Sequence, residues 1–293
     1  MIDNENEVCG FVNILKPTGM TSFDVVRVVK KTLGTKRVGH LGTLDPAAAG
    51  VLPVAVGKAT KFFDYFLNKD KVYFAVIKFG IETDTMDSYG KVIMTEEVDV
   101  CESELESAIQ KFIGKQLQVP PKFSAVKVDG KKAYELAREN ADFELKPREI
   151  EVFDIKIVKK VDKNAFLLKV HSSAGTYIRT LMSDIAKALN AIAFTPVIIR
   201  TKSGAFCESE AMTLDEFKDN PKVFKIQEVL HDKPIIRISD RLAKKVLNGV
   251  KVCKDEFEIS LENDSEFFIE FENRIVGLFK VSANKLERVV YIG

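Results

Sequence analysis

The sequence GHLGTLDPAAAG, residues 39–50, holds one carboxylate, Asp45, in a loop made almost entirely of small residues. Pro46 disfavours a helical backbone for the residue before it, so we expect Asp45 to be extended and its side chain to project from the loop. The glycines of this stretch let another molecule approach the backbone closely. The loop therefore predicts a site where a large group meets a single carboxylate, although an ordinary Asp-Pro turn has the same pattern.

The chain as a whole has the composition of an ordinary globular protein. Its 293 residues are 46% hydrophobic and 30% charged, which suits about two domains and argues against a disordered chain. No apolar run approaches the ~18 residues of a membrane span, and the acidic N-terminus lacks the apolar segment of a signal peptide. The four cysteines lie far apart and form no CxxC pair. We therefore expect a cytoplasmic protein with reduced thiols, no metal and no membrane association.

Charge is distributed unevenly, although the net charge is only +1. Residues 16–61 contain eight Lys or Arg and two acids, whereas residues 255–272 contain eight acids and no Lys or Arg. The first stretch is a candidate surface for phosphates and the second is not. A solvated surface with no partner explains either stretch equally well on charge alone.

Hydrophobic periodicity predicts an α+β fold with a mainly antiparallel sheet and a small, β-rich C-terminal unit. A short helix is expected in that unit at residues 240–250. The expected strands of the larger unit lie at residues 8–15, 51–56, 71–80, 149–161, 165–173 and 196–206, and its expected helices at 21–33, 58–67, 103–114 and 176–190.

Three side chains are candidates to complete a site around Asp45. Arg179 lies near the start of the expected helix 176–190, at the edge of its apolar stripe, and a nearby guanidinium would keep a carboxylate ionised. Tyr73 lies on an apolar strand, where it is either a core residue or a platform for a base. His40 could be a base, a ligand or a wedge, but no second ligand has metal-binding spacing. Spacing alone favours a surface ion pair for Arg179 and a core position for Tyr73.

Several long motifs of the chain resemble those of the TruB family, the bacterial tRNA pseudouridine(55) synthases. The central motif is GHLGTLDPAAAGVLPVAVGKATK, residues 39–61. Four other stretches, 14–26, 71–90, 120–138 and 172–186, agree with the family in order and spacing.

The chain has no GxxxxGK[ST] loop and no GxGxxG or GxSxG turn, which argues against nucleotide-cofactor and serine-hydrolase chemistry.

The resemblance implies a pseudouridine synthase fold in which residues 8–230 form the catalytic domain. An RNA-gripping insertion is expected at about 120–148 and a PUA-like RNA-binding domain at 233–293. The implied reaction isomerises uridine 55, in the T loop of tRNA, without a metal or another cofactor. The N1–C1′ bond breaks, the uracil turns, and C5 joins C1′, which requires the base to be flipped out of its stack. The expected partner is the T arm of tRNA, and the expected state is a monomer.

The resemblance also implies roles for single residues. Asp45 matches the catalytic aspartate, and Arg179 matches the arginine that pairs with it. Tyr73 matches the tyrosine that stacks on the target base, and His40 matches the histidine that fills the space the base leaves. How Asp45 acts stays open: it could attack C1′, attack C6 of the uracil, or remove the C2′ proton.

Further residues are expected around this centre. Lys16, together with Pro17, matches a pair that supports the active site, and Ile198 is expected to contact the substrate. The residues expected to bind RNA phosphates are Lys61, Lys127, Lys131, Lys132, Arg138 and Arg200.

Two departures from the family pattern stand out. The chain has Ile198-Ile199-Arg200-Thr201 where the family usually has Leu-Arg-Arg-Thr, so one arginine is missing. The acidic stretch 255–272 should not meet phosphate, and any RNA contact of the C-terminal unit would come from lysines such as Lys244, Lys245 and Lys251. Two alternatives stay open, a guide-RNA-dependent synthase of the same family and a non-catalytic protein that binds or folds tRNA.

Overall fold

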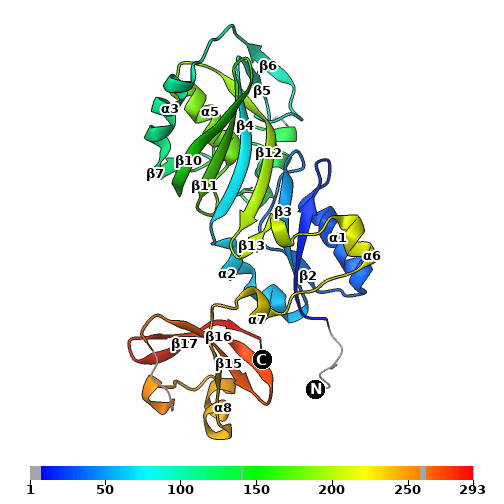
Figure 1. Cartoon of the computed structure of the whole chain (residues 1–293), viewed down its shortest axis with the longest axis vertical. Helices are drawn as coiled ribbons and strands as arrows, with labels where there is room; N and C mark the ends of the chain where they lie inside the picture. Colours follow the sequence, from blue (N-terminus) through cyan, green and yellow to red (C-terminus); the bar gives the residue numbers. More distant parts are fainter. Residues whose placement is uncertain (1–7, 140, 258–261, 293) are drawn as a thin grey trace.

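The computed structural model describes residues 8–139, 141–257 and 262–292. In these residues, nine strands form one large mixed sheet, and the molecule is elongated (Figure 1). The strands of the large sheet are β1 (Gly10–Lys16), β2 (Val38–His40), β3 (Ala49–Val56), β4 (Lys71–Phe79), β7 (Gly114–Gln118), β10 (Arg148–Asp162), β11 (Ala165–Ser172), β12 (Ala193–Ser203) and β13 (Phe206–Cys207).

The main path of this sheet runs β1-β3-β12-β4-β11-β10-β7, with β2 paired to β3 and β13 to β12. Neighbouring strands are antiparallel except β3 and β12, which run parallel. The predicted α+β class with a mainly antiparallel sheet is confirmed. Two small hairpins lie outside the sheet and are formed by β5 (Ile81–Thr83) with β6 (Val92–Thr95) and by β8 (Lys127–Val128) with β9 (Lys131–Lys132).

The first helix begins and ends where its sequence signals predict. The Thr21 hydroxyl accepts from the Asp24 N–H, and the Asp24 carboxylate accepts from the Thr21 N–H, so two free donors of the first turn are satisfied. Gly34 ends the helix in the left-handed region, at φ 62°. The α-helices are α1 (Ser22–Leu33), α2 (Phe63–Leu67), α3 (Glu102–Ile109), α4 (Ala133–Arg138), α5 (Ile178–Ala188), α6 (Leu214–Asp219), α7 (Ile226–Val229) and α8 (Asp240–Leu247). The 3₁₀ helices are η1 (Gly57–Phe62), η2 (Gln110–Phe112), η3 (Glu208–Glu210) and η4 (Lys254–Glu256).

Two helices differ from the sequence predictions. The segment 58–67 is divided into η1 and α2 rather than forming one helix. Helix α3 begins one residue earlier than predicted and is capped at Cys101 instead of Ser103, because the Glu104 carboxylate accepts from the Cys101 N–H at 3.1 Å. It also ends sooner, at Ile109, and continues as the 3₁₀ turn η2.

One face of the large sheet is covered by α3 and α5 (Figure 1). Alternate residues of β4 point into the core on that face, namely Tyr73, Ala75 and Ile77. Residues of the opposite parity, such as Phe74, are only half buried. Tyr73 therefore faces the same layer as α5. No helix in the part of the chain that the structure describes is both long and apolar enough to span a membrane.

The second sheet lies at the other end of the molecule with α8 (Figure 1). It packs on the larger unit through a shared apolar cluster that joins Phe62 and Phe66 to Phe268 and Leu278. The predicted boundary between 230 and 233 stays a prediction, since this cluster has members on both sides of it. The four strands are β14 (Ile235–Arg237), β15 (Glu266–Phe271), β16 (Arg274–Ser282) and β17 (Lys285–Tyr291).

A polar contact accompanies this apolar cluster. The Tyr65 hydroxyl donates to the Glu266 carboxylate at 2.9 Å, and the Lys233 ammonium lies 3.4 Å from the same carboxylate. Burial and the Glu266 carboxylate both raise the pKa of Tyr65, so its hydroxyl stays protonated at physiological pH.

The acidic stretch 255–272 is partly neutralised within the second unit. Glu270 pairs with Arg237 at 2.7 Å, and Glu256 pairs with Lys245, one of the lysines expected to contact RNA. Residues 258–261 of this stretch, like residue 140 of the expected insertion and residues 1–7, lie outside the described residues.

Replacing Phe268 by Ala should lower the free energy of unfolding by about 3–5 kcal/mol, because it opens a cavity in the cluster that joins the two units. Ile235 is the cross-strand partner of Phe268 and provides a matched control. It is 46% exposed, whereas Phe268 is fully buried, so Ile235→Ala should change stability by less than about 0.5 kcal/mol. Urea unfolding followed by circular dichroism measures both, and equal losses would show that this cluster does not hold the units together.

Candidate active site

The loop between β2 and β3, residues 41–48, is fastened to its surroundings by main-chain contacts. The Ser22 hydroxyl at the start of α1 donates to the Leu44 carbonyl at 2.9 Å and accepts from the Leu44 N–H at 2.8 Å. The Gly19 N–H donates to the Pro46 carbonyl at 2.8 Å. These contacts fix the main chain on both sides of Asp45. The rest of the fold therefore sets the position of the Asp45 carboxylate.

Gly50 follows this loop, and its glycine is required by the packing of two strands. Its backbone has φ +110°, which side-chain-bearing residues rarely adopt, and a Cβ there would lie 2.2 Å from the Arg200 carbonyl oxygen. Only glycine lets β3 and β12 approach this closely at the point where they run parallel. The glycine thus serves strand packing rather than the approach of a ligand.

Asp45 is paired with Arg179, as the resemblance implied. The Arg179 Nη2 lies 2.7 Å from the Asp45 Oδ2, and the side chains are 3% and 35% exposed, respectively. The guanidinium also donates to the Thr85 carbonyl at 2.8 Å and to the Phe123 carbonyl at 3.0 Å. Arg179 is therefore buried at the start of α5, whereas helical spacing alone favoured a surface ion pair.

A second carboxylate, that of Asp87, completes the surroundings of Arg179. Its Oδ2 lies 3.7 Å from the Arg179 Nη1, and its Oδ1 accepts from the Thr85 hydroxyl at 2.6 Å and the Tyr89 N–H at 2.9 Å. Asp87 does not stand out in the sequence, because the turn around it also contains Glu82 and Asp84. Two carboxylates thus face one buried guanidinium.

Tyr177 borders the same centre, because the charges of Asp45 and Arg179 both act on its phenol. Contact of Tyr73 with this centre stays a prediction. Tyr73 is buried in the core cluster beside α5, and its neighbours across the sheet are Arg200 and Val170. Tyr177, also missed from sequence, stands just before α5 and is tied to Gln118, whose amide donates to its carbonyl and accepts from its N–H. Burial raises the pKa of Tyr177, and the Asp45 carboxylate adds to the rise, so the phenol stays neutral and can donate a hydrogen bond.

Lys16 is almost fully buried beneath the site. Its ammonium donates to the carbonyls of Pro17 and Met20, both at 2.8 Å, and so shapes the turn that contacts the Asp45 loop. Burial lowers the pKa of Lys16 to about 8, with Asp45 opposing this shift and Arg200 adding to it. Lys16 therefore remains largely protonated at pH 7. This geometry agrees with a supporting role.

His40 ends β2, opposite Val54, and is partly buried. Its Nδ1 has no hydrogen-bond partner in the part of the chain described. Burial, together with the nearby Arg200 cation, lowers the pKa of His40, so its ring is neutral at pH 7. A neutral ring suits a wedge better than a phosphate contact.

The position of Arg200 differs from the exposed one that its predicted contact with RNA requires. It is 1% exposed, and its guanidinium donates to the carbonyls of Val51, Thr43 and Gly42 at 2.8, 3.1 and 3.2 Å. Because all three acceptors lie in or beside the Asp45 loop, Arg200 holds that loop from below. It has no exposed guanidinium to offer a phosphate.

The neighbours of Arg200 on β12 show where the arginine that is missing from the family pattern would lie. Ile198 is buried opposite Ala75, on the face of the sheet that carries Tyr73. Ile199 is 41% exposed and points to the other face, because side chains alternate along a strand. The missing arginine would therefore lie away from Asp45.

The predicted RNA-binding residues fall into two groups. Lys127, Lys131, Lys132 and Arg138 are exposed on the β8–β9 hairpin and α4, next to Phe123, whose carbonyl binds Arg179. Lys61 is exposed elsewhere, with its ammonium 5.7 Å from the centre of the Tyr291 ring in the second unit. Contact of these residues with RNA stays a prediction.

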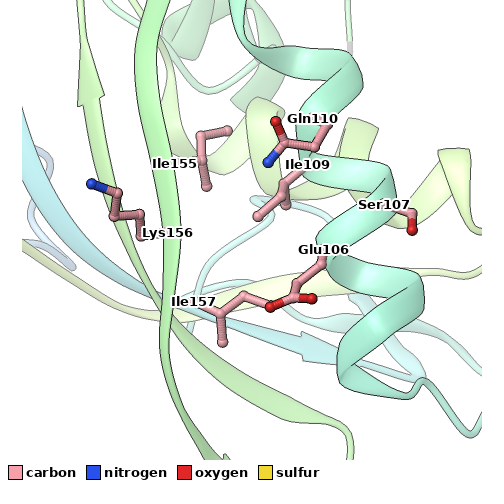
Figure 2. Close-up of a pocket in the computed structure, with 7 residues that line it drawn as sticks. All are labelled: Glu106, Ser107, Ile109, Gln110, Ile155, Lys156 and Ile157. Carbon is pink, nitrogen blue, oxygen red and sulfur yellow. The ribbon is translucent and has the colours of Figure 1, made fainter.

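A separate groove lies between α3 and β10 (Figure 2). Ile109, Ile155 and Ile157 point between helix and strand, while Lys156 points away from the helix. The groove shares no residue with the Asp45 centre. In the described residues, no group of three or more His, Cys, Asp or Glu side chains could hold a metal ion.

Comparison with known proteins identifies the family. The model of the TruB family pseudouridylate synthase N-terminal domain matches residues 30–178. The tRNA pseudouridine synthase B of Clostridium novyi is 41% identical over 92% of this chain and 94% of its own length, and that of Clostridium acetobutylicum is 38% identical over 93% and 96%. The chain belongs to the TruB family.

Solved structures support the fold of this TruB family member. A chain in the crystal structure of a Cbf5-Nop10-Gar1 complex matches with a TM-score of 0.73 at 25% identity, over 97% of this chain and 85% of that chain. A chain of an H/ACA RNP bound to a substrate RNA containing 2′-deoxyuridine gives a TM-score of 0.70 at 23% identity, over 97% and 85%. The predicted pseudouridine synthase fold is confirmed.

Replacing Arg200 by Lys should loosen the Asp45 loop, because a single ammonium cannot reach three carbonyls fixed by a planar guanidinium. We expect amide hydrogen exchange in peptides covering residues 41–48 to accelerate by about tenfold, which corresponds to about 1.4 kcal/mol. Lys202→Gln, a partly exposed change on the same strand, should leave this exchange unaltered. Unchanged exchange in the Arg200 variant would contradict the anchoring role.

Proposed function

We propose that this protein isomerises uridine 55, in the T loop of tRNA, to pseudouridine. The observation that carries the proposal is the buried Arg179 paired at 2.7 Å with the partly exposed Asp45, inside the loop that bears the family motif. The identity to the tRNA pseudouridine synthases B, about 40% over most of both chains, supports tRNA as the substrate.

In the proposed mechanism, the target nucleotide leaves its stack and enters the cleft beside Asp45. Unstacking costs a few kcal/mol, and stacking on Tyr73 offsets about 1–3 kcal/mol of it. His40, as a neutral wedge, fills the gap in the RNA and slows the return of the base. Ile198 and Tyr177 border the base on the face that carries Tyr73.

Asp45 acts through its free oxygen. Oδ2 accepts from Arg179, which leaves Oδ1 for the nucleoside. Arg179 keeps the carboxylate aimed, since a guanidinium anchored by two carbonyls cannot turn away. The reaction is an isomerisation that exchanges one glycosidic bond for another, with no net oxidation or group transfer. We therefore propose that it needs no metal or other cofactor.

Two surfaces would hold the rest of the tRNA. The exposed Lys and Arg residues of the β8–β9 hairpin and α4 suit phosphates beside the cleft, and residues 120–148 would act as the RNA-gripping insertion. The second unit would act as a PUA-like RNA-binding domain through Lys244 and Lys251. We further propose a cytoplasmic monomer, consistent with a tRNA-modifying family.

The two alternatives make different predictions about bare RNA. A guide-RNA-dependent synthase would need added RNA and proteins, whereas this chain should act alone. The identity is 41% to the tRNA pseudouridine synthase B of Clostridium novyi but only 25% to the matched chain of the Cbf5-Nop10-Gar1 complex, which supports action without partner proteins. Pseudouridine mapped at position 55 of an unmodified tRNA transcript, after incubation with the purified chain only, would exclude both the guide-dependent and the non-catalytic alternative.

Replacing Asp45 by Asn should abolish pseudouridine formation, with a loss of at least about 10⁴-fold, while tRNA affinity changes by less than about threefold. The amide keeps the size of the side chain but removes its charge and nucleophilicity. Tritium release from 5-tritiated uridine measures turnover, and filter binding measures affinity. Turnover near the wild-type rate would refute the role of Asp45.

Replacing both Lys131 and Lys132 by Gln should weaken tRNA binding and reduce the slope of log K against log [salt] by about 1.5, because each phosphate contact contributes about 0.7–0.9. The turnover number of bound substrate should stay within about twofold. Lys159→Gln/Lys160→Gln on β10 removes the same charge from another exposed segment and is the matched control. If both double variants lower the slope equally, the hairpin makes no specific RNA contact.

A further inference from the structure

The loop that joins β5 to β6, residues 84–91, is held in one conformation by its own polar groups. The Asp84 carboxylate accepts from the Lys91 N–H at 2.8 Å, and the Thr85 hydroxyl donates to the Asp87 carboxylate at 2.6 Å. A Cβ at Gly90 would lie 2.4 Å from the Thr85 hydroxyl oxygen, so the loop crosses itself closely. The Thr195 N–H binds the Met86 carbonyl at 3.0 Å and ties the loop to β12.

Tyr89 projects from this ordered loop, and its side chain takes no part in the centre described above. Its N–H binds the Asp87 carboxylate, but its side chain is 57% exposed. The hydroxyl oxygen lies 3.7 Å from the position that a Cβ on Gly19 would take, so the phenol reaches the turn formed by residues 16–20. Gly19 has φ +85° and offers no side chain to cover the phenol.

Of the two segments that Tyr89 connects, one contacts Arg179 and the other contacts the residue after Asp45. On one side, the Thr85 carbonyl and the Asp87 carboxylate bind Arg179. On the other side, the Gly19 N–H binds the carbonyl of Pro46, the residue after Asp45. Tyr89 thus bridges the loop that binds Arg179 and the turn that binds the Asp45 loop, with more than half of its side chain open to solvent.

We propose that Tyr89 is a second stacking platform, which packs its phenol against a nucleotide that flanks the flipped uridine. This inference rests on the proposed function and adds a positioning residue to it. A flipped nucleotide leaves its neighbours without one stacking partner, and an exposed aromatic ring on a rigid support can replace it at little entropic cost. Tyr73 holds the target base inside the cleft, whereas Tyr89 contacts the strand at the entrance.

The ring, and not the hydroxyl, carries this role. The hydroxyl forms no hydrogen bond with another described residue, so removing it leaves no buried group unsatisfied. Tyr89→Phe should therefore behave like the wild type, whereas Tyr89→Ala should lose the platform. Stacking of one base on an aromatic ring accounts for about 5- to 160-fold in affinity.

The first experiment uses the absence of tryptophan from the chain, which lets one introduced indole report on its own surroundings. The double variant Asp45→Asn/Tyr89→Trp binds a T-arm stem-loop without turnover, and the RNA should quench its fluorescence by stacking. Val158→Trp with Asp45→Asn is the control, at an exposed site on β10, two strands away from β4. Equal emission changes at both positions, or none at position 89, would overturn the proposal.

The second experiment separates binding from chemistry. Tyr89→Ala should raise KM for the tRNA transcript by at least fivefold with kcat within about twofold, and Tyr89→Phe should restore the wild-type KM. Circular dichroism checks that each variant is folded. A KM for Tyr89→Ala within twofold of the wild type overturns the proposal. Failure of the wild type itself to form pseudouridine would instead refute the proposed function, so the two failures are distinguishable.

Discussion

The burial of the Arg179 guanidinium is the constraint on which the site depends. A cation that is 3% exposed needs a partner for its charge and for its donors, or its removal from water costs several kcal/mol. Its partners come from three distant parts of the chain: the Asp45 loop, the 84–91 loop and the segment that begins the insertion at Phe123. A single side chain thus brings together the Asp45 carboxylate, the Asp87 carboxylate and the start of the proposed RNA-gripping insertion.

Arg200 performs a similar task from below the site, but with carbonyl groups only. It binds the carbonyls of Gly42 and Thr43 in the Asp45 loop and that of Val51 just after the loop, so three main-chain acceptors are paired. Lys16 does the same for the turn beside the loop. The loop that presents Asp45 is therefore held by hydrogen bonds to its main chain from Arg200, Ser22 and Gly19. Burial of its Leu41, Leu44 and Ala48 side chains accompanies these bonds.

Much of the fold followed from the sequence, because α1, β4 and α5 carry strong periodicity and clear end signals. The identity of Asp45 and its partner came from long motifs that resemble the family. The spacing of residues did not predict that Asp87 and Tyr177 lie at the site, because their contacts join residues far apart in the chain. Arg200 was expected to bind RNA phosphates through the resemblance to the family. Its burial depends on main-chain carbonyls that the sequence does not mark.

The apolar cluster between the two units has a geometric consequence. Because Phe62 and Phe66 pack against the core of the second sheet, that sheet is not free to swing on a tether. The separation between Asp45 and the far end of the molecule is set by the fold. An RNA that touches both must have a stem of matching length and direction. The enzyme would then discriminate by the length of the RNA stem. It would reject a uridine with the right neighbours when the helix that carries it is too short or too long.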